Sequence, residues 1–252
     1  MMKKFALYPS LKDRCVIITG GATGIGAEIV SAFAGQDCKV GFLDLDEVEG
    51  KKLANKLGKN VYFQNCDLRD ISGLKLSISK LINMMGSIDV LVNNAARDDR
   101  HDWKEVTEDY WDERFATNLR HQFFAIQQVA DNMINNKHGS IINIGSNSWW
   151  EAGGDFPAYA TAKSAVYGLT RTMARVLGQH RIRVNSVLPG WTMTERQKEL
   201  WVTDEDLENQ YKRQCLPDLI EAVYVARMVL FLASDDGAMC TANNYSVEAG
   251  SI

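Results

Sequence analysis

The sequence lacks the features that mark secreted, metal-binding, membrane and nucleic-acid-binding proteins. Its five cysteines are scattered without a Cys-x-x-Cys pair, as expected of reduced thiols in the cytoplasm. Its four histidines have no metal-ligand spacing, so we expect no metal. No apolar run is long enough to cross a bilayer, and Pro9 interrupts the short apolar stretch at the start, so we expect neither a membrane span nor a signal sequence. A net charge of -4 without long basic runs predicts a small-molecule partner rather than nucleic acid.

Short β-branched runs alternate with longer amphipathic stretches along the chain. The expected strands are Cys15–Thr19, Lys39–Leu43, Val61–Gln64, Val90–Asn93, Ser140–Ile144, Arg183–Val187 and Tyr245–Val247. The expected helices are Gly24–Gln36, Glu47–Leu57, Ile71–Met85, Asp109–Asn136 with a break near Thr117, Ala158–Gly178 and Ile220–Ala233. Such alternation predicts an α/β fold with a doubly wound parallel β-sheet and helices on both faces. Residues 1–252 are expected to form a single domain, because α/β folds of this length are commonly undivided.

One long segment interrupts this alternation. Residues 191–217 are polar and rich in Glu, Lys and Gln, and we call them the substrate-loop segment. A loop of that length in a compact domain is often a lid, so we expect it to cover a substrate.

A glycine-rich turn follows the first expected strand and opens the first expected helix. Gly20 allows the tight turn, Gly24 lets the backbone approach a pyrophosphate, and Gly26 lets helix and strand pack closely. Glycine also marks ordinary turns, but the strand–turn–helix context favours the dinucleotide site of a Rossmann fold. The cofactor-binding residues expected in this turn are Gly20, Thr23, Gly24, Ile25 and Gly26.

The second expected strand is followed by Asp44, at the distance where an acid can bind ribose hydroxyls. A carboxylate there would repel a 2′-phosphate, and the glycine turn contains no basic residue, so we expect NAD rather than NADP. The alternative is that Asp44 and Asp46 only cap the next helix, a role that suits Asp46 better.

Tyr159 and Lys163 are four residues apart in an expected helix and therefore share one face. A phenol titrates near pH ~10, and a neighbouring ammonium favours the phenolate, which makes Tyr159 a candidate base. Ser146 adds a hydroxyl that can donate to a substrate oxygen. Each residue also has an ordinary interpretation: Tyr159 in the core, Lys163 on the surface and Ser146 in a turn.

These motifs, in this order, resemble the short-chain dehydrogenase/reductase family nearly from end to end. The resemblance rests on Thr19-Gly-x-x-x-Gly-Ile-Gly26, Asp67-Leu68, Asn93-Asn-Ala-Ala96, Asn118, Ser146, Tyr159-x-x-x-Lys163 and Pro189-Gly190. It implies a catalytic tetrad of Asn118, Ser146, Tyr159 and Lys163. It also implies cofactor contacts from Asp67, Leu68, Asn94, Ala95, Tyr159, Lys163, Pro189, Gly190, Thr192 and Thr194. Two residues depart from the family pattern, Ala96 in place of glycine and Thr192 in place of an aliphatic residue.

The resemblance also implies a mechanism. Tyr159 would take the alcohol proton, and Ser146 would hold the substrate oxygen. Lys163 would bind the nicotinamide ribose and lower the pKa of the tyrosine. Asn118 would position a water that carries the proton outward, although it could instead be a cap at the helix break.

Other segments resemble bacterial aldose 1-dehydrogenases of this family, such as those that act on D-xylose. These are Tyr8–Leu11, Arg97–His101, Tyr110–Arg114, Asn118–His121, Ser148-Trp149 and Leu232–Asp236. Indole faces suit the C–H face of a sugar. The expected substrate contacts are Ser146, Asn147, Trp149, Tyr159 and Trp191, whereas packing in the core or lid is the alternative for the tryptophans. The resemblance implies that Asn93–Ala96 form the floor of the cofactor site, which we call the cofactor floor. The charged stretch Arg97–His101 is expected to be a solvated loop, although it follows this floor and could reach the pocket rim.

The sequence therefore predicts an NAD-dependent enzyme that oxidises an aldose at C1 to the lactone. A polyol or secondary-alcohol dehydrogenase, or a 3-oxoacyl reductase, could use the same tetrad. A non-catalytic NAD-binding sensor or scaffold is the alternative outside enzymes. The family resemblance also implies a homotetramer with contacts through the expected helices at Asp109–Asn136 and Ala158–Gly178 and through the last strand.

Overall fold

The computed structural model describes residues 5–152 and 154–251. Residues 1–4, part of the region where we expect no signal sequence, lie outside the described residues. Seven strands form one parallel sheet in the order β3-β2-β1-β4-β5-β6-β7. The strands are β1 (Cys15–Thr19), β2 (Lys39–Asp44), β3 (Val61–Asn65), β4 (Val90–Asn93), β5 (Gly139–Ile144), β6 (Ile182–Pro189) and β7 (Asn244–Val247). This topology confirms the predicted doubly wound Rossmann fold.

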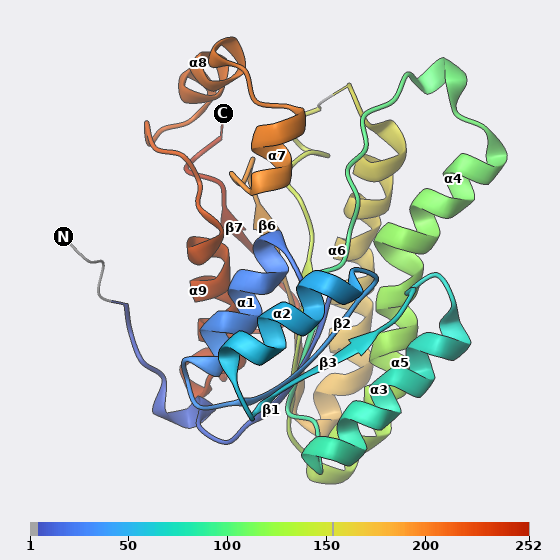
Figure 1. Ribbon diagram of the computed structural model, residues 1–252, viewed down its shortest axis with the longest axis vertical. Coiled ribbons are helices and arrows are strands. Elements are labelled where there is room, and N and C mark those ends of the chain that lie inside the picture. The colour runs from blue at the N-terminus through green and yellow to red at the C-terminus, as the bar shows by residue number, and fades with distance from the viewer. Residues whose placement is uncertain (1–4, 153, 252) are drawn as a thin grey trace.

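Helices cover both faces of the sheet (Figure 1). One face carries α1 (Gly24–Ala34), α2 (Glu47–Leu57) and α9 (Ala222–Ala233). The other carries α3 (Ile71–Met85), α4 (Glu108–Phe115), α5 (His121–Asn136) and α6 (Pro157–Leu177). Among the residues that the structure describes, no helix combines the length and apolar character needed to cross a membrane.

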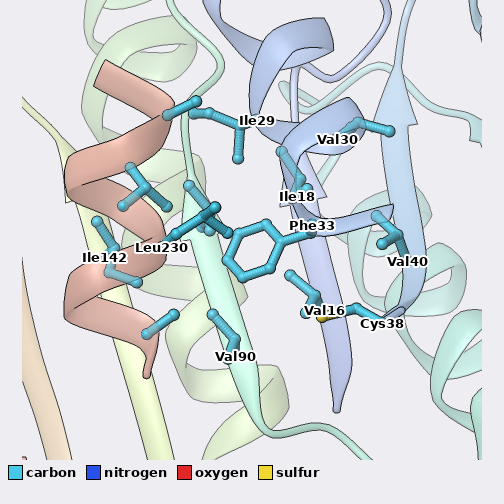
Figure 2. Close-up of a cluster of buried hydrophobic side chains, with 14 of the residues drawn as sticks. Val16, Ile18, Ile29, Val30, Phe33, Cys38, Val40, Val90, Ile142 and Leu230 are labelled. Carbon is cyan, nitrogen blue, oxygen red and sulfur yellow. The ribbon is translucent and has the colours of Figure 1, made fainter. Parts of the chain in front are cut away.

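The apolar runs of the central strands are buried on both sides. Val16 and Ile18 of β1 join the core beneath α1 and α9, where Figure 2 shows them beside Phe33 and Leu230. Ile17, between them in the chain, joins the opposite core beneath α3, α5 and α6. Because successive side chains point to opposite faces, a strand buried on both sides needs a continuous apolar run.

The order of the strands fixes the place of the site. The chain first builds outward from β1 to β3 and then resumes at β4 on the other side of β1. Ligands in such sheets bind beyond the carboxyl ends of the strands at this switch point. The segments that follow β1, β4, β5 and β6 therefore meet there.

The expected helix at 109–136 is divided as predicted. A π-helical turn at Ala116–Arg120 separates α4 from α5 and contains Asn118. The other expected strands and helices differ from the observed ones by at most two residues at either end.

The substrate-loop segment contains two short helices that the sequence did not predict. They are α7 (Glu195–Leu200) and α8 (Asp204–Arg213), which lie together at one end of the molecule (Figure 1). The Thr194 side chain caps α7 by accepting from the N–H of Gln197. Thr203 and Asp206 form a capping box at the start of α8. These caps supply hydrogen bonds to end groups that short helices otherwise leave unpaired.

Candidate active site

A cleft of about 1550 Å³ lies at the carboxyl ends of the strands. The expected cofactor residues that line it are Gly20, Thr23, Gly24, Ile25, Gly26, Asp44, Asp67, Leu68, Asn94, Ala95, Pro189, Gly190, Thr192 and Thr194. Ser146, Asn147, Tyr159, Lys163 and Trp191 line the same cleft. Asn118 and Trp149 are not among the lining residues. The fold thus collects nearly all of the expected site residues from segments far apart in the sequence.

At Gly20 and Gly26 the glycine turn packs so closely against neighbouring backbone that there is no room for a side chain. A Cβ at Gly20 would lie 2.6 Å from the Cα of Ala95, and one at Gly26 would lie 1.8 Å from the carbonyl oxygen of Gly20. Gly20 and Gly24 have φ angles of +66° and +56°, which L residues rarely adopt. The turn therefore presents bare backbone and the first N–H groups of α1 to the cleft, which fits a pyrophosphate.

The loop after β4 forms the opposite wall and is held from both sides. Asn94 donates from Nδ2 to the carbonyl oxygen of Gly20 at 2.7 Å, and its N–H donates to Thr19 Oγ1 at 3.0 Å. On the far side, His121 Nε2 donates to the Ala95 carbonyl oxygen at 3.1 Å. Burial lowers the pKa of His121 to about 4, so this histidine is neutral. No pattern in the sequence indicated this role of His121.

Asp44 connects the end of β2 to the glycine turn. Its Oδ2 accepts from the N–H of Ala22 at 2.9 Å, and its Oδ1 accepts from the N–H of Asp46 at 3.0 Å. Asp46 caps α2 by accepting from the N–H groups of Val48 and Glu49. The capping role thus belongs to Asp46, and Asp44 remains on the wall of the cleft.

Asp67 lies on the same wall and is paired with Arg69. Arg69 donates to both carboxylate oxygens, with Nη2 2.7 Å from Oδ2 and Nε 3.0 Å from Oδ1. This hydrogen bonding lowers the pKa of Asp67. Glu113 Oε1 is a second partner of Arg69, at 3.4 Å from Nη1.

Tyr159 and Lys163 lie one turn apart on α6 and both face the cleft. Lys163 Nζ is 5.7 Å from the centre of the Tyr159 ring and donates to the Ile144 carbonyl oxygen at 2.7 Å. Ser146 follows β5, and its hydroxyl lies 3.0 Å from that of Ser148. The end of β5 and the first turns of α6 thus bring the three expected reacting groups to one place.

The electrostatics differ from the expectation that Lys163 lowers the pKa of Tyr159. Burial raises the pKa of Tyr159, and the charge of Asp98 raises it further, whereas a hydrogen bond with Ser146 lowers it. Burial also lowers the pKa of Lys163 to about 7. In the structure desolvation is the largest cause of both shifts, because each charged form loses water on burial.

Asn118 lies in the π-helical turn behind the cleft wall. Its Oδ1 accepts from the N–H of Arg97 at 2.8 Å, and its Nδ2 donates to the Arg114 carbonyl oxygen at 2.9 Å. Gln122 Nε2 donates to the Asn118 carbonyl oxygen at 3.2 Å. The side chain therefore fixes the loop after β4 relative to α4 and α5.

The two tryptophans expected to contact substrate lie in different surroundings. Trp191 lines the cleft and donates from Nε1 to Gln197 Oε1 at 2.8 Å. Trp149 is half-buried and stacks edge-on with Trp150, with ring centres 5.4 Å apart. Of the two tryptophans, only Trp191 is among the residues that line the cleft.

The charged stretch after β4 is not simply solvated. Asp98 lines the cleft, where its Oδ1 accepts from Arg196 Nη1 at 2.5 Å and its Oδ2 from Gln197 Nε2 at 2.6 Å. Asp99 Oδ1 accepts from Arg196 Nη2 at 2.7 Å. This pairing could not be predicted from the sequence, since residues about a hundred positions apart leave no periodic signal.

The sheet, the glycine cradle and the Ser146, Tyr159 and Lys163 cluster define the class of a dinucleotide-dependent oxidoreductase. The comparison with protein families agrees: residues 14–205 match the family described as short chain dehydrogenase. The chain belongs to this family and is an oxidoreductase that uses a nicotinamide cofactor.

Individual relatives cover nearly the whole chain. It is 43% identical to a D-xylose 1-dehydrogenase of Caulobacter vibrioides over 97% of this chain and 98% of that protein. It is 42% identical to a "Probable galactose dehydrogenase" of Rhizobium meliloti over 96% of each. Among solved structures, a 3-oxoacyl-[acyl-carrier protein] reductase from Brucella melitensis superposes with a TM-score of 0.91 at 28% identity, covering 100% of this chain and 97% of that one.

Proposed function

We propose that this protein is an NAD-dependent aldose 1-dehydrogenase, which oxidises a cyclic sugar at C1 to the lactone. The observation that carries the proposal is the 42–43% identity, over nearly the full length, to two proteins named for the oxidation of aldoses. The cleft supports it, because Trp191, Asn147 and Glu151 offer an indole face and polar groups beside the expected reacting residues. A cyclic hemiacetal carries its hydroxyl and its transferable hydrogen on one carbon, so the chemistry needs no metal.

In the proposed reaction Tyr159 accepts the proton of the C1 hydroxyl, and Ser146 donates a hydrogen bond to the substrate oxygen. Lys163 holds the nicotinamide ribose and remains near the phenol. Asn118 keeps the loop after β4 in place through Arg97, and we retain it as the fourth member of the tetrad. Bound NAD supplies the acceptor for the hydride that leaves C1.

The proposed preference for NAD rests on Asp44. Its carboxylate lies on the cleft wall beside the glycine turn, where it can accept from ribose hydroxyls and repel a 2′-phosphate. Arg69, a basic residue on this wall, is already paired with Asp67 and Glu113. Its charge is therefore largely compensated and offers little attraction to a phosphate.

We also propose a cytoplasmic homotetramer in which residues 1–252 form one catalytic unit and the substrate-loop segment covers the sugar. Large apolar side chains are exposed on three of the helices for which contacts are expected, namely Trp111 on α4, Phe123 on α5 and Val176 on α6. Exposed apolar groups of this size favour burial against another copy of the chain. Light scattering after size-exclusion chromatography measures the assembly directly.

The decisive experiment is a screen for NADH production with pentoses, hexoses, deoxyhexoses and polyols, combined with detection of the lactone. We expect turnover of an aldopyranose and lactone release. Turnover of acyclic polyols or of 3-hydroxyacyl substrates alone would assign the enzyme to one of those alternatives. NAD binding without turnover on any alcohol would favour the non-catalytic scaffold.

Tyr159→Phe tests the proposed base in the same assay. Since general base catalysis is worth ~10²- to 10⁴-fold, we expect turnover to fall by that order while NAD affinity is nearly unchanged. A variant that turns over almost normally would refute the role of Tyr159.

A further inference from the structure

The helix that carries Tyr159 begins without a side-chain cap of its own. Helix α6 starts at Pro157, and its N-cap residue is Phe156, whose side chain cannot accept a hydrogen bond. Tyr159 is the third residue of this helix, so the expected base lies within its first turn. The N–H groups of a first turn have no partner inside the helix, and helix ends fray. The position of Tyr159 therefore depends on what holds this turn from outside.

His101, in the loop after β4, supplies a cap from outside the helix. Its Nε2 accepts from the N–H of Ala158 at 3.3 Å. The backbone N–H of the same histidine donates to the Asp155 carbonyl oxygen at 2.8 Å. His101 therefore holds the chain on both sides of the point where α6 begins.

The imidazole ring of His101 is itself held in one tautomer. Its Nδ1 lies 2.9 Å from the carbonyl oxygen of Asp99, which can only accept, so Nδ1 carries the proton and donates. Nε2 is then available to accept, as the bond from Ala158 requires. Tyr110 Oη lies 3.0 Å from Nδ1, and the two rings meet edge-on with their centres 5.0 Å apart. Helix α4 and the loop after β4 thus fix the ring that caps α6.

His101 lies outside the cleft, next to the backbone that carries the expected base. It is half-buried and is not among the residues that line the cleft. Ala158, its partner, is fully buried and directly precedes Tyr159. A shift of the Ala158 backbone would therefore move the phenol. A displacement of about 1 Å, caused by a mutation far from the chemistry, can cost ~10²-fold in rate.

We propose that His101 is a positioning residue that fixes Tyr159 by capping the first turn of α6. It acts through the N–H of Ala158 and does not touch the reacting atoms. The proposal rests on the role of Tyr159 proposed above but not on the identity of the substrate.

Two amide substitutions separate the cap from the other contacts of the ring. Gln can place its Oε1 where Nε2 lies and so keeps an acceptor for Ala158, whereas Asn reaches only to the position of Nδ1. With the best alcohol or aldose of the screen, we expect His101→Asn to lower kcat about ten- to hundredfold. His101→Gln should keep most of kcat. The substrate KM and the affinity for NAD should change little in either variant, because His101 does not line the cleft.

Tyr110→Phe is the matched control. It removes the hydroxyl beside Nδ1 and leaves the bond between Nε2 and Ala158 in place. We expect its kcat to stay near that of the wild type. An unchanged kcat in His101→Asn would overturn the proposal, as would equal losses in His101→Asn and His101→Gln, since both would show that the cap does not position Tyr159.

A measurement without turnover separates this proposal from the proposed function. Amide hydrogen exchange, followed by mass spectrometry on the protein without substrate, reports local opening of the first turns of α6, residues 157–163. We expect exchange there to be faster in His101→Asn than in the wild type and in His101→Gln. Equal exchange in all three proteins refutes the cap, whereas normal turnover of Tyr159→Phe refutes the role of the base itself.

Discussion

Lys163 lies one helical turn beyond Tyr159, with its Nζ 5.7 Å from the centre of the phenol ring and fixed to the Ile144 carbonyl oxygen at 2.7 Å. Lys163 as a whole is only 1% exposed, so its ammonium group lacks most of its water. Burial lowers its pKa to about 7, against about 10.5 in an unfolded chain. A lysine held in this way weakens the fold near neutral pH, which is a cost that a catalytic or cofactor-binding role explains.

Lys163→Met should therefore separate stability from function. Between pH 7 and about 10 the unfolded wild-type chain holds a proton that the folded protein lacks, so raising the pH stabilises the fold. This gain is absent at and below pH 7, where the burial penalty is fully present. We expect the variant to lose most of this pH-dependent gain, as measured by denaturant unfolding of both proteins from pH 7 to 9.

The same variant should also lose turnover and bind NAD more weakly, because Lys163 is proposed to serve both. Isothermal titration with NAD measures the second effect apart from the first. Unchanged NAD affinity would remove the ribose contact from the proposal. A wild-type stability that falls between pH 7 and 9 relative to the variant would contradict the lowered pKa of Lys163.

Asp44 is expected to set the cofactor preference. Asp44→Asn keeps the acceptor for the Ala22 N–H but removes the charge that would repel a 2′-phosphate. Because hydrogen bonds to charged groups are worth about 1.5–3 kcal/mol, kcat/KM with NAD should fall about tenfold or more, while kcat/KM with NADP rises. Asp46→Asn is the control, since Asp46 caps α2 and should not alter the ratio. Better use of NADP by the wild type would overturn the assignment.

Gly26 is expected to tolerate no side chain. An alanine Cβ would lie 1.8 Å from the carbonyl oxygen of Gly20 and 2.7 Å from Asn94 Nδ2, so the glycine turn and the loop after β4 must both shift. We expect Gly26→Ala to lose NAD binding and at least about 1–3 kcal/mol of unfolding free energy, the usual cost of overpacking. The measurements are NAD titration and chemical denaturation.

Gly178→Ala provides the contrast. Gly178 has an ordinary helical conformation with open space where a Cβ would lie. Alanine there restricts the unfolded chain, so stability should rise by about 0.4–1 kcal/mol with NAD binding unchanged. Equal losses in both variants would show that the clash at Gly26 is not what matters.

The strands and most helices could be predicted from the sequence because their signals are local. Residues Cys15–Ile18 are all apolar because both faces of β1 are buried. The glycines at 20, 24 and 26 follow this strand at the spacing that a phosphate-binding turn requires. The helices of the substrate-loop segment were missed, although Thr203 and Asp206 carry the spacing of a capping box. The polar composition of that segment hid this signal.

The remaining features depend on contacts between distant parts of the chain. The pairing of Arg196 with Asp98 joins α7 to the loop after β4, and the hydrogen bond from His121 to Ala95 joins α5 to the cofactor floor. The raised pKa of Tyr159 likewise follows from burial, which one helix face cannot reveal. Sequence spacing places residues on one face of an element, but it does not show what packs against that face.

The last prediction concerns the sugar. Trp191 lines the cleft and Trp149 does not, so the two indoles expected to contact substrate should differ. Trp191→Ala should raise KM for the sugar about tenfold, equivalent to about 1.4 kcal/mol of lost ring contact, with a smaller effect on KM for NAD. Trp149→Ala should raise the sugar KM less.

Trp191→Phe separates the contribution of the ring from that of the Nε1 hydrogen bond to Gln197, since phenylalanine keeps an aromatic face but has no donor. If Trp191→Phe raises the sugar KM as much as Trp191→Ala, Trp191 acts through the anchoring of α7. If Trp149→Ala raises the sugar KM more than Trp191→Ala, the sugar binds beside Trp149 instead.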